Sequence, residues 1–357
     1  METIFSYHHL REFTHEVFIR MGCSLDHAAL ATEVLLSADL RGIDSHGIAR
    51  LSGYVRLWEA KRINTRPDIK ITHETPSTAV VDGDSGLGLV VAPYAMEVAM
   101  RKAGEVGTGW VSVKNSNHFG IAGYHAMKAL ERDMIGMAMT NASPLVAPTF
   151  ATERMLGTNP IAVAIPAKEQ PPFVADFATT TAANGKLEIL QRKNEEAPLG
   201  WIQDKNGNPS TNPHELKNGG ALLPLGGDRE HGSHKGYCLG AIVDIFSAVL
   251  SGANYGPWAP PFVSFLPLAP DPVGVGLGHF LGAMRVDAFR PADEFKANMD
   301  TWISRFRAAE AIPGKEVLIP GDPERETYHH RLDNGIPVVA SVVKDLQDLA
   351  GKFDLNF

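Results

Sequence analysis

Residues 109–140 read GWVSVKNSNHFGIAGYHAMKALERDMIGMAMT, and this stretch decides the predicted fold class. Residues 109–114 and 135–140 are short runs without proline that are rich in apolar side chains, which is typical of strands. Residues 120–130, which lie between them, are predicted to form a helix. A strand, a helix and a second strand in succession predict a sheet that is covered by helices.

The same alternation continues on both sides of this stretch. Upstream, residues 78–82 are a predicted strand, residues 83–88 a glycine-rich turn and residues 92–103 a helix rich in alanine and methionine. Downstream, residues 161–165 and 173–177 are densely apolar, as buried strands are. Strands and helices therefore mix through the middle of the chain, and the predicted class is α/β, in a mixed α+β arrangement.

The N-terminal 60 residues are predicted to be helical. Leu10, Phe13 and Val17 recur at helical spacing, and a second helical run follows them. Ser45 is a predicted N-cap, because a serine side chain can accept a hydrogen bond from the first turn of a helix. We therefore expect a third helix over residues 46–58.

The C-terminal half alternates helical and irregular segments. Residues 235–251, 295–311 and 339–352 are predicted helices. Residues 191–233 are polar and rich in asparagine, glycine and proline, and residues 258–278 are rich in proline and glycine. The first is predicted to form extended surface segments, and the second to be irregular.

Glycines do not form the usual dinucleotide-binding fingerprint in this chain. The pair Gly86 and Gly88 is followed by Val91 where that fingerprint needs glycine or alanine. The glycines at 274, 276 and 278 follow no clear strand. The sequence therefore argues against an ordinary Rossmann unit.

Composition excludes several classes of protein. The chain has 357 residues, of which 44% are hydrophobic. Its net charge is −8, and its lysines and arginines form no basic run of the kind that binds nucleic acid. Residues 1–18 are interrupted by charged side chains, and the apolar residues 239–250 are too few to span a bilayer. The two cysteines, Cys23 and Cys238, form no CxxC pair. We therefore expect no membrane insertion, and a reducing, cytoplasmic setting.

The segment DSHGIARLSGY, residues 44–54, contains the most informative polar side chains. If Ser45 caps a helix, His46, Arg50 and Tyr54 follow at intervals of four residues and share one helical face. A proton carrier, a guanidinium fork and a phenol on one face suit a 2-hydroxy acid, which has a carboxylate to hold and a hydroxyl proton to lose. The alternative is a solvated helix with ordinary polar residues.

Further polar candidates lie at the ends of predicted strands. His118, in NSNHFG, follows the strand 109–114, where ligands of α/β sheets gather, although it could be a loop histidine bonded to the backbone. Asn141 is a candidate ligand contact or a turn residue, and Asp176 could accept from a ribose hydroxyl or cap a helix. Lys235 opens a glycine-flanked helix and could neutralise a pyrophosphate, or be a solvated lysine. No metal site is predicted, because no third ligand accompanies the pair His231 and His234 at a familiar spacing.

Eight segments in fixed order resemble the malate/L-lactate dehydrogenase family, also called the type 2 malate dehydrogenases. They run from about residue 40 to residue 325 and read LRGIDSHGIARLSGY, VKNSNHFGIAGYHA, MTNASPLVAPTF, LGTNPIAV, VADFATT, GSHKGYCLGAIVDIF, GLGHF and PGDPE. The resemblance implies a family-specific, non-Rossmann NAD(P)-binding fold and a homodimer with the active site near the subunit interface. It also implies NAD or NADP as the cofactor.

The resemblance assigns roles residue by residue. His46 matches a proposed proton donor, Arg50 a carboxylate binder, and Ser45 and Tyr54 substrate-site positions. His118 matches a second histidine that has the acid/base role in some members. Positions that match cofactor contacts are Asp176, Phe177, Ala178, Lys235, Gly236, Gly321, Asp322 and Pro323. Cys238 departs from the family pattern, which has glycine there, and residues 251–275 diverge.

Three parts and one activity are therefore predicted. Residues 1–75 are the helical region with the substrate motif, residues 76–290 the NAD(P)-binding α/β domain, and residues 291–357 a helical region that packs back on the first part. The predicted reaction moves a hydride between NAD(P) and a small 2-hydroxy or 2-oxo acid, most simply malate/oxaloacetate or L-lactate/pyruvate. We favour His46 as the proton carrier, because it shares the predicted helical face with Arg50.

Other functions stay open at this point. Within the family, the substrate could instead be ureidoglycolate, sulfolactate, diketogulonate or a cyclic imine. Outside it, the fourteen histidines permit a metallohydrolase, and a binding protein without activity could keep the family fold. The joint presence of the Ser45, His46, Arg50, His118 and Lys235 side chains argues against the last alternative.

Overall fold

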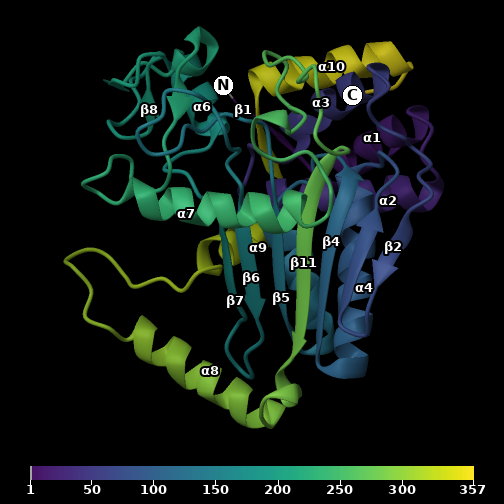
Figure 1. The fold of residues 1–357 in the computed structure, drawn as a ribbon, viewed down its shortest axis with the longest axis vertical. Coiled ribbons are helices and arrows are strands. Elements are labelled where there is room, and N and C mark those ends of the chain that lie inside the picture. The colour runs from purple at the N-terminus through teal and green to yellow at the C-terminus, as the bar shows by residue number, and fades with distance from the viewer. Residues whose placement is uncertain (1) are drawn as a thin grey trace.

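A seven-stranded mixed sheet forms the centre of the computed structural model, which describes residues 2–357 (Figure 1). Strands β3 and β4 run parallel, and the remaining neighbours in this sheet run antiparallel. In spatial order the strands are β2 (Lys70–Glu74), β3 (Thr78–Asp82), β4 (Thr108–Ser116), β11 (Leu277–Arg285), β5 (Met134–Thr140), β6 (Ile161–Ile165) and β7 (Phe173–Phe177). The predicted class is confirmed, and the predicted strands 78–82, 109–114, 135–140, 161–165 and 173–177 are present.

The middle strand of the sheet, β11, was not predicted. Its sequence, LGHFLGAMR, contains two glycines, which weaken a strand assignment. Both are needed for close approach: a Cβ on Gly278 would lie 2.1 Å from the Ser247 carbonyl oxygen, and one on Gly282 would lie 2.4 Å from the Trp110 ring. Packing between distant segments therefore explains residues that look unsuitable for a strand when they are read alone.

Helices cover both faces of this sheet, in the three layers seen in Figure 1. Helices α4 (Gly88–Val106) and α5 (Ala122–Met127) pack on one face, and α7 (Ser233–Asp244) with the π-helical turn Ile245–Val249 packs on the other. Strand β5 alternates accordingly, since Ala138 joins the core under α4 whereas Met139 joins the cluster under α7.

The two ends of the chain share a second core. Helices α1 (Tyr7–Arg20), α2 (Leu25–Leu40), α3 (Leu51–Glu59) and α10 (Ala340–Phe353) pack together, and β1 (Glu2–Phe5) pairs antiparallel with β12 (Ile336–Val339). Buried residues from both ends, such as Leu35 and Leu346, belong to one apolar cluster. The three-part division at residues 75 and 290 stays a prediction.

The remaining elements lie around the sheet. They are α6 (Asn184–Lys193), α8 (Ala292–Arg307), α9 (Asp322–Asn334) and a small sheet of β8 (Ile202–Gln203), β9 (Pro209–Ser210) and β10 (Ala221–Leu222). Helix α8 lies at the end of the sheet opposite the N-terminal helices (Figure 1). Helix α9 was not predicted, because its sequence DPERETYHHRLDN has no apolar stripe. No helix within residues 2–357 is both long and apolar enough to cross a membrane.

Candidate active site

The SHG segment forms a turn, so the predicted helix start at Ser45 is wrong. A 3₁₀ turn occupies Ile48–Arg50, and α3 begins only at Leu51. The cause lies in α2, where the Asp39 carboxylate accepts a hydrogen bond of 2.7 Å from the Ile48 N–H. Gly47 lies so close that a Cβ there would be 2.1 Å from an Asp39 carboxylate oxygen. Residues 44–47 are therefore held against α2 and cannot continue α3 toward its N-terminus.

Three polar rings nevertheless meet, but they are those of His46, Tyr54 and His118 and do not form the predicted helical face of His46, Arg50 and Tyr54. The rings of His46 and His118 stack with centroids 5.7 Å apart, and the Tyr54 hydroxyl lies 2.7 Å from His118 Nδ1. His118 comes from the loop that follows β4, whereas Tyr54 belongs to α3. The Phe262 ring packs 4.6 Å from His118 and 5.2 Å from Tyr54, between centroids. Two segments that are 64 residues apart therefore form one histidine cluster, defined here as His46, Tyr54 and His118.

Hydrogen bonds select the tautomer of the neutral His118 ring. The Gly120 backbone N–H donates to His118 Nδ1 over 3.3 Å. A backbone N–H can only donate, so this contact favours the tautomer of neutral His118 that has its lone pair on Nδ1 and its ring proton on Nε2. The Tyr54 hydroxyl can then donate to the same Nδ1. His46 is different, because its Nδ1 lies 2.8 Å from Ser45 Oγ, which can accept or donate.

Arg50 lies beside these rings with part of its guanidinium available. Its Nε donates to the Ser45 carbonyl oxygen, and its Nη2 is 3.7 Å from Glu188 Oε2. Helix α6 carries Glu188 and lies directly over the turn, since a Cβ on Gly185 would be 2.6 Å from Ser45 Cβ. The Arg50–Glu188 separation is longer than a hydrogen bond, so Arg50 can still take a bidentate carboxylate ligand.

Burial and local positive charge keep both histidines neutral. Burial, followed by the charge of Arg50, lowers the pKa of His46 to about 4. Burial lowers the pKa of His118 well below its usual range, and the charges of His46, Arg50 and His279 act in the same direction. Both rings are therefore uncharged at neutral pH in the free protein.

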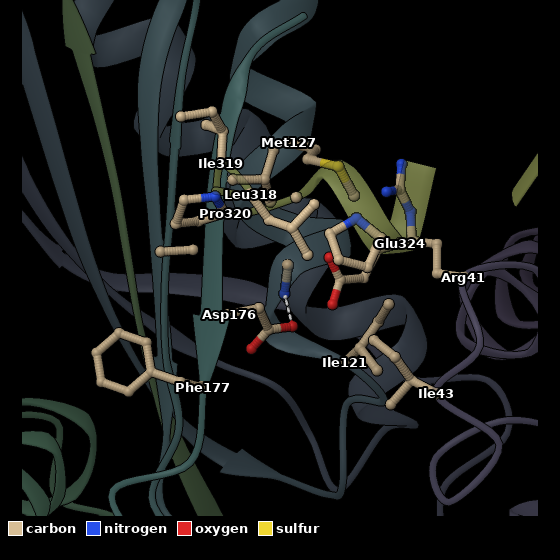
Figure 2. Close-up of a pocket in the computed structure, with 15 residues that line it drawn as sticks. Arg41, Ile43, Ile121, Met127, Asp176, Phe177, Leu318, Ile319, Pro320 and Glu324 are labelled. Carbon is tan, nitrogen blue, oxygen red and sulfur yellow. Dashed lines mark hydrogen bonds between the residues drawn. The ribbon is translucent and has the colours of Figure 1, made fainter. Parts of the chain in front are cut away.

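A cavity of about 410 Å³ is lined in part by the two segments that carry the histidine cluster, and Figure 2 shows its lining residues. Two of its lining residues, Ile43 and Ile121, lie two residues before Ser45 and three residues after His118. Most of the wall is apolar, and the charged side chains in it are Arg41, Asp176 and Glu324. The cavity is therefore a slot for a largely apolar group with polar atoms at one side.

Asp176 faces this cavity and is fixed by the backbone. Its Oδ2 accepts a 2.7 Å hydrogen bond from the Gly123 N–H, drawn as a dashed line in Figure 2. A Cβ at position 123 would lie 2.8 Å from that oxygen, so glycine permits the approach. The Asp176 side chain is exposed to the cavity, but desolvation by the groups packed around its carboxylate raises the pKa to about 6, while the Gly123 hydrogen bond opposes this and the Glu324 carboxylate adds to it. The Asp176 carboxylate is thus ionised at neutral pH, with a pKa about one unit below neutrality.

The other residues predicted to contact a cofactor divide into two groups. Phe177, Gly321 and Pro323 line the same cavity as Asp176, whereas Ala178, which follows Phe177 on the chain, does not. Asp322 instead is buried beside Arg307 and Arg325, with separations of 2.9 and 2.7 Å, and holds the start of α9. Phe177, Gly321 and Pro323 thus join Asp176 at the cavity, whereas Ala178 and Asp322 do not line it.

Three further predicted contacts lie outside the cavity. The amide of Asn141 is engaged by the Asn254 carbonyl oxygen and the Gly278 N–H, at 2.7 and 3.0 Å. Gly236 packs closely, since a Cβ there would be 2.3 Å from the Leu225 nitrogen. Lys235 is exposed in the first turn of α7. Asn141 and Gly236 thus have structural partners, and Lys235 remains open to a ligand.

Sequence reasoning missed Glu188, Phe262, Arg41 and Glu324. Arg41 and Glu324 lie within the motifs LRGIDSHGIARLSGY and PGDPE but have no role assigned there, whereas Phe262 lies in the divergent segment 251–275 and Glu188 in a segment without a motif. No signal in the sequence places them near the histidines or the cavity. His231 contacts Asp228, and His234 contacts Arg229. Across the described chain, His, Cys, Asp and Glu side chains form no group of three that could hold a metal ion.

Known proteins share this architecture over nearly the whole chain. Residues 5–347 match the profile of the family described as malate/L-lactate dehydrogenase. A malate dehydrogenase from Pyrococcus abyssi is 43% identical over 343 residues, covering 96% of this chain and 92% of that protein. A malate/(S)-sulfolactate dehydrogenase from Methanothermus fervidus is 40% identical and covers 94% of each chain. The crystal structure of malate dehydrogenase from Entamoeba histolytica has a TM-score of 0.92 at 34% identity, covering 100% and 99% of the two chains.

Proposed function

Because the chain belongs to the malate/L-lactate dehydrogenase family, it is a hydroxy acid dehydrogenase, and we propose that the histidine cluster is its active site. The reaction moves a hydride between a nicotinamide cofactor and the carbon that carries the hydroxyl, and it moves a proton to or from the oxygen. The protein must therefore hold a carboxylate, polarise an oxygen and carry a proton.

Arg50 is proposed to hold the substrate carboxylate, and His46 to carry the proton. The guanidinium of Arg50 is half-buried and matches the two oxygens of a carboxylate. The reacting carbon of a 2-hydroxy acid is bonded to that carboxylate, so its oxygen comes to lie beside the neighbouring rings. With Ser45 Oγ accepting from the His46 Nδ1–H, the lone pair on His46 Nε2 is free to take the hydroxyl proton during oxidation.

His118 is proposed to meet the second demand. The observation that carries this assignment is the Gly120 N–H donating to His118 Nδ1, which leaves the proton on Nε2. In that form His118 is a hydrogen-bond donor and cannot accept a proton at Nε2. It therefore polarises the substrate oxygen, while Tyr54 and Gly120 hold the ring in place.

The cavity beside the cluster fits the adenosine end of a nicotinamide dinucleotide. Its apolar wall suits a flat ring system, and Asp176 can accept from ribose hydroxyls. The tight approach of Gly123 to Asp176 holds that carboxylate toward the cavity. When bound, the nicotinamide supplies or accepts the hydride. Lys235 is retained as a candidate for the pyrophosphate, because it is exposed at the N-terminus of α7.

Malate/oxaloacetate is the substrate pair that we propose first. The relatives that are most similar in sequence among those above are named malate dehydrogenase or malate/(S)-sulfolactate dehydrogenase. L-lactate/pyruvate is the next pair. An E. coli relative that is 29% identical is named ureidoglycolate dehydrogenase, and that substrate, sulfolactate, diketogulonate or a cyclic imine is the alternative.

A substrate screen tests this function directly. Oxidation of NADH and NADPH is followed at 340 nm with oxaloacetate, pyruvate, sulfopyruvate, diketogulonate and a cyclic imine. We expect turnover with a 2-oxo acid, and oxaloacetate to have the highest kcat/KM. Turnover of the imine alone would move the protein to the alternative, and no turnover with any of them would contradict the proposal.

A homodimer in the cytoplasm is also proposed. The outer side of α7 and the π-helical turn exposes a row of large apolar side chains, which in a soluble monomer is unusual. The row consists of Tyr237, Ile242, Ile245, Phe246, Val249 and Leu250. A second copy that covers it would explain the exposure. Sedimentation at micromolar concentration should give a dimer for the protein and a monomer for Ile245→Asp, and a monomeric wild type with full activity would contradict the dimer.

A further inference from the structure

The charged side chains that line the cavity give it a net negative charge. Asp176 and Glu324 line it with two carboxylates, and Arg41 contributes one guanidinium. In Figure 2 the Glu324 carboxylate lies between Asp176 and Arg41. The guanidinium carbon of Arg41 is 5.6 Å from the centroid of the Tyr328 ring, so part of its charge is held against that ring.

Asp176 has one carboxylate oxygen left for a ligand. Oδ2 accepts from the Gly123 N–H, and within residues 2–357 Oδ1 has no hydrogen-bond donor. An oxygen of this kind accepts hydrogen bonds and donates none, so it needs a hydroxyl or an amine opposite it. A ribose presents two adjacent hydroxyls, whereas a ribose with a 2′-phosphate presents an anion at one of these positions.

Glu324 strengthens this selection from a second element of the cavity wall. It lies in the first turn of α9, while Asp176 ends β7, so the two carboxylates approach the cavity from different elements. A phosphate between them would face two like charges at short range in a partly enclosed site, where repulsion is stronger than in water. A neutral hydroxyl avoids that repulsion.

We infer that this cavity selects NAD(H) over NADP(H), and that Glu324 is a specificity-determining residue for the cofactor. The inference rests on the proposed function, because it takes the cavity to hold the adenosine ribose. Asp176 binds the ribose hydroxyls, and Glu324 repels the additional phosphate. Arg41 neutralises one of the two carboxylates but leaves the cavity with a net negative charge.

Direct binding measurements test this inference without turnover. NADH and NADPH are titrated by nucleotide fluorescence against wild type, Glu324→Gln and Glu326→Gln. Glu326 is the matched control, because it lies on α9 two residues away and is exposed outside the cavity. ADP-ribose and 2′-phospho-ADP-ribose are then used as competitors, since they keep the adenosine end and lack the nicotinamide.

We expect wild type to bind NADH at least about tenfold more tightly than NADPH, since one repulsive charge contact at short range has this magnitude. Glu324→Gln should tighten NADPH binding by roughly tenfold and leave NADH within about twofold. Glu326→Gln should change neither Kd, and the two competitors should show the same preference as the dinucleotides.

Several results would overturn the inference. NADPH binding to wild type as tightly as NADH would do so, as would a Glu324→Gln variant with unchanged NADPH affinity and a wild-type circular dichroism spectrum. A loss of NADPH affinity in Arg41→Gln alone would show that the arginine binds the phosphate. If neither nucleotide binds to wild type, the proposed function itself fails, which is a different outcome from binding without preference.

Discussion

The histidine cluster and the neighbouring cavity both desolvate their ionisable groups, but the nearby charge is positive in the cluster and negative in the cavity. In the cluster, burial and Arg50 lower the pKa of His46 to about 4. In the cavity, desolvation and Glu324 raise the pKa of Asp176 to about 6. Desolvation favours the neutral form of each group, and the nearby charge then decides which ligand can bind. The first region suits an anionic carboxylate, and the second suits an uncharged hydroxyl.

The largest effect should come from the proton carrier of the cluster. His46→Gln should reduce kcat about 10²–10⁴-fold, the usual cost of losing a general acid or base, while KM changes little. His231→Gln is the control, because that histidine is exposed and bound to Asp228. Steady-state kinetics with the 2-oxo acid measure both. Near-normal kcat in His46→Gln together with a loss in His118→Gln would exchange the two roles.

Arg50 should have the next largest effect, because it provides the positive charge of the cluster. Arg50→Ala should raise KM for the 2-oxo acid roughly ten- to a hundredfold, as expected for lost hydrogen bonds to a charged group. Arg50→Lys should recover only part of the loss, since an ammonium lacks the planar fork. Arg290→Ala, in an exposed ion pair with Glu294, serves as the control. An unchanged KM in Arg50→Ala would place the carboxylate elsewhere.

The pH profile tests whether charge is the difference between the two regions. With the cofactor saturating, so that Asp176 is already engaged, neutral His46 is the base in the oxidation direction, and kcat/KM for the hydroxy acid should hold as pH falls below 6.5 and drop only near the His46 pKa of about 4. A bound carboxylate offsets the charge of Arg50, so the pKa seen in kcat should be higher than that in kcat/KM. Arg50→Ala should also raise the pKa that is seen in the pH profile of kcat/KM. A single pKa near 6.5 in both profiles would contradict this account.

Glu188 should give the smallest effect. Its carboxylate is 3.7 Å from Arg50, so it competes weakly with the substrate for that guanidinium. Glu188→Gln should lower KM for the 2-oxo acid by about two- to fivefold, in line with the modest strength of partly exposed ion pairs. Glu195→Gln, which lies just beyond α6 and is exposed, is the control. A higher KM in Glu188→Gln would mean that Glu188 positions Arg50 instead of competing.

The sequence by itself determined the elements whose signals are local. Apolar runs identified five strands of the sheet, and the family motifs identified His46, Arg50, Tyr54 and His118 before their geometry was known. Local patterns succeed here because a buried strand needs apolar side chains along its whole length. The same reasoning failed for the start of α3, since the Asp39 carboxylate that blocks it comes from another helix.

Only the tertiary structure decided which side chains face each other. The Gly120 N–H beside His118 and the Glu188 carboxylate near Arg50 have no sequence signal, and the PGDPE motif does not show that its Glu324 shares a cavity with Asp176. Strand β11 was hidden for the same reason, because its glycines are explained by contacts with residues far along the chain. Charges and hydrogen bonds act over a few ångströms in space, whatever the separation in sequence, so the cofactor preference and the division of roles between the two histidines depend on the fold.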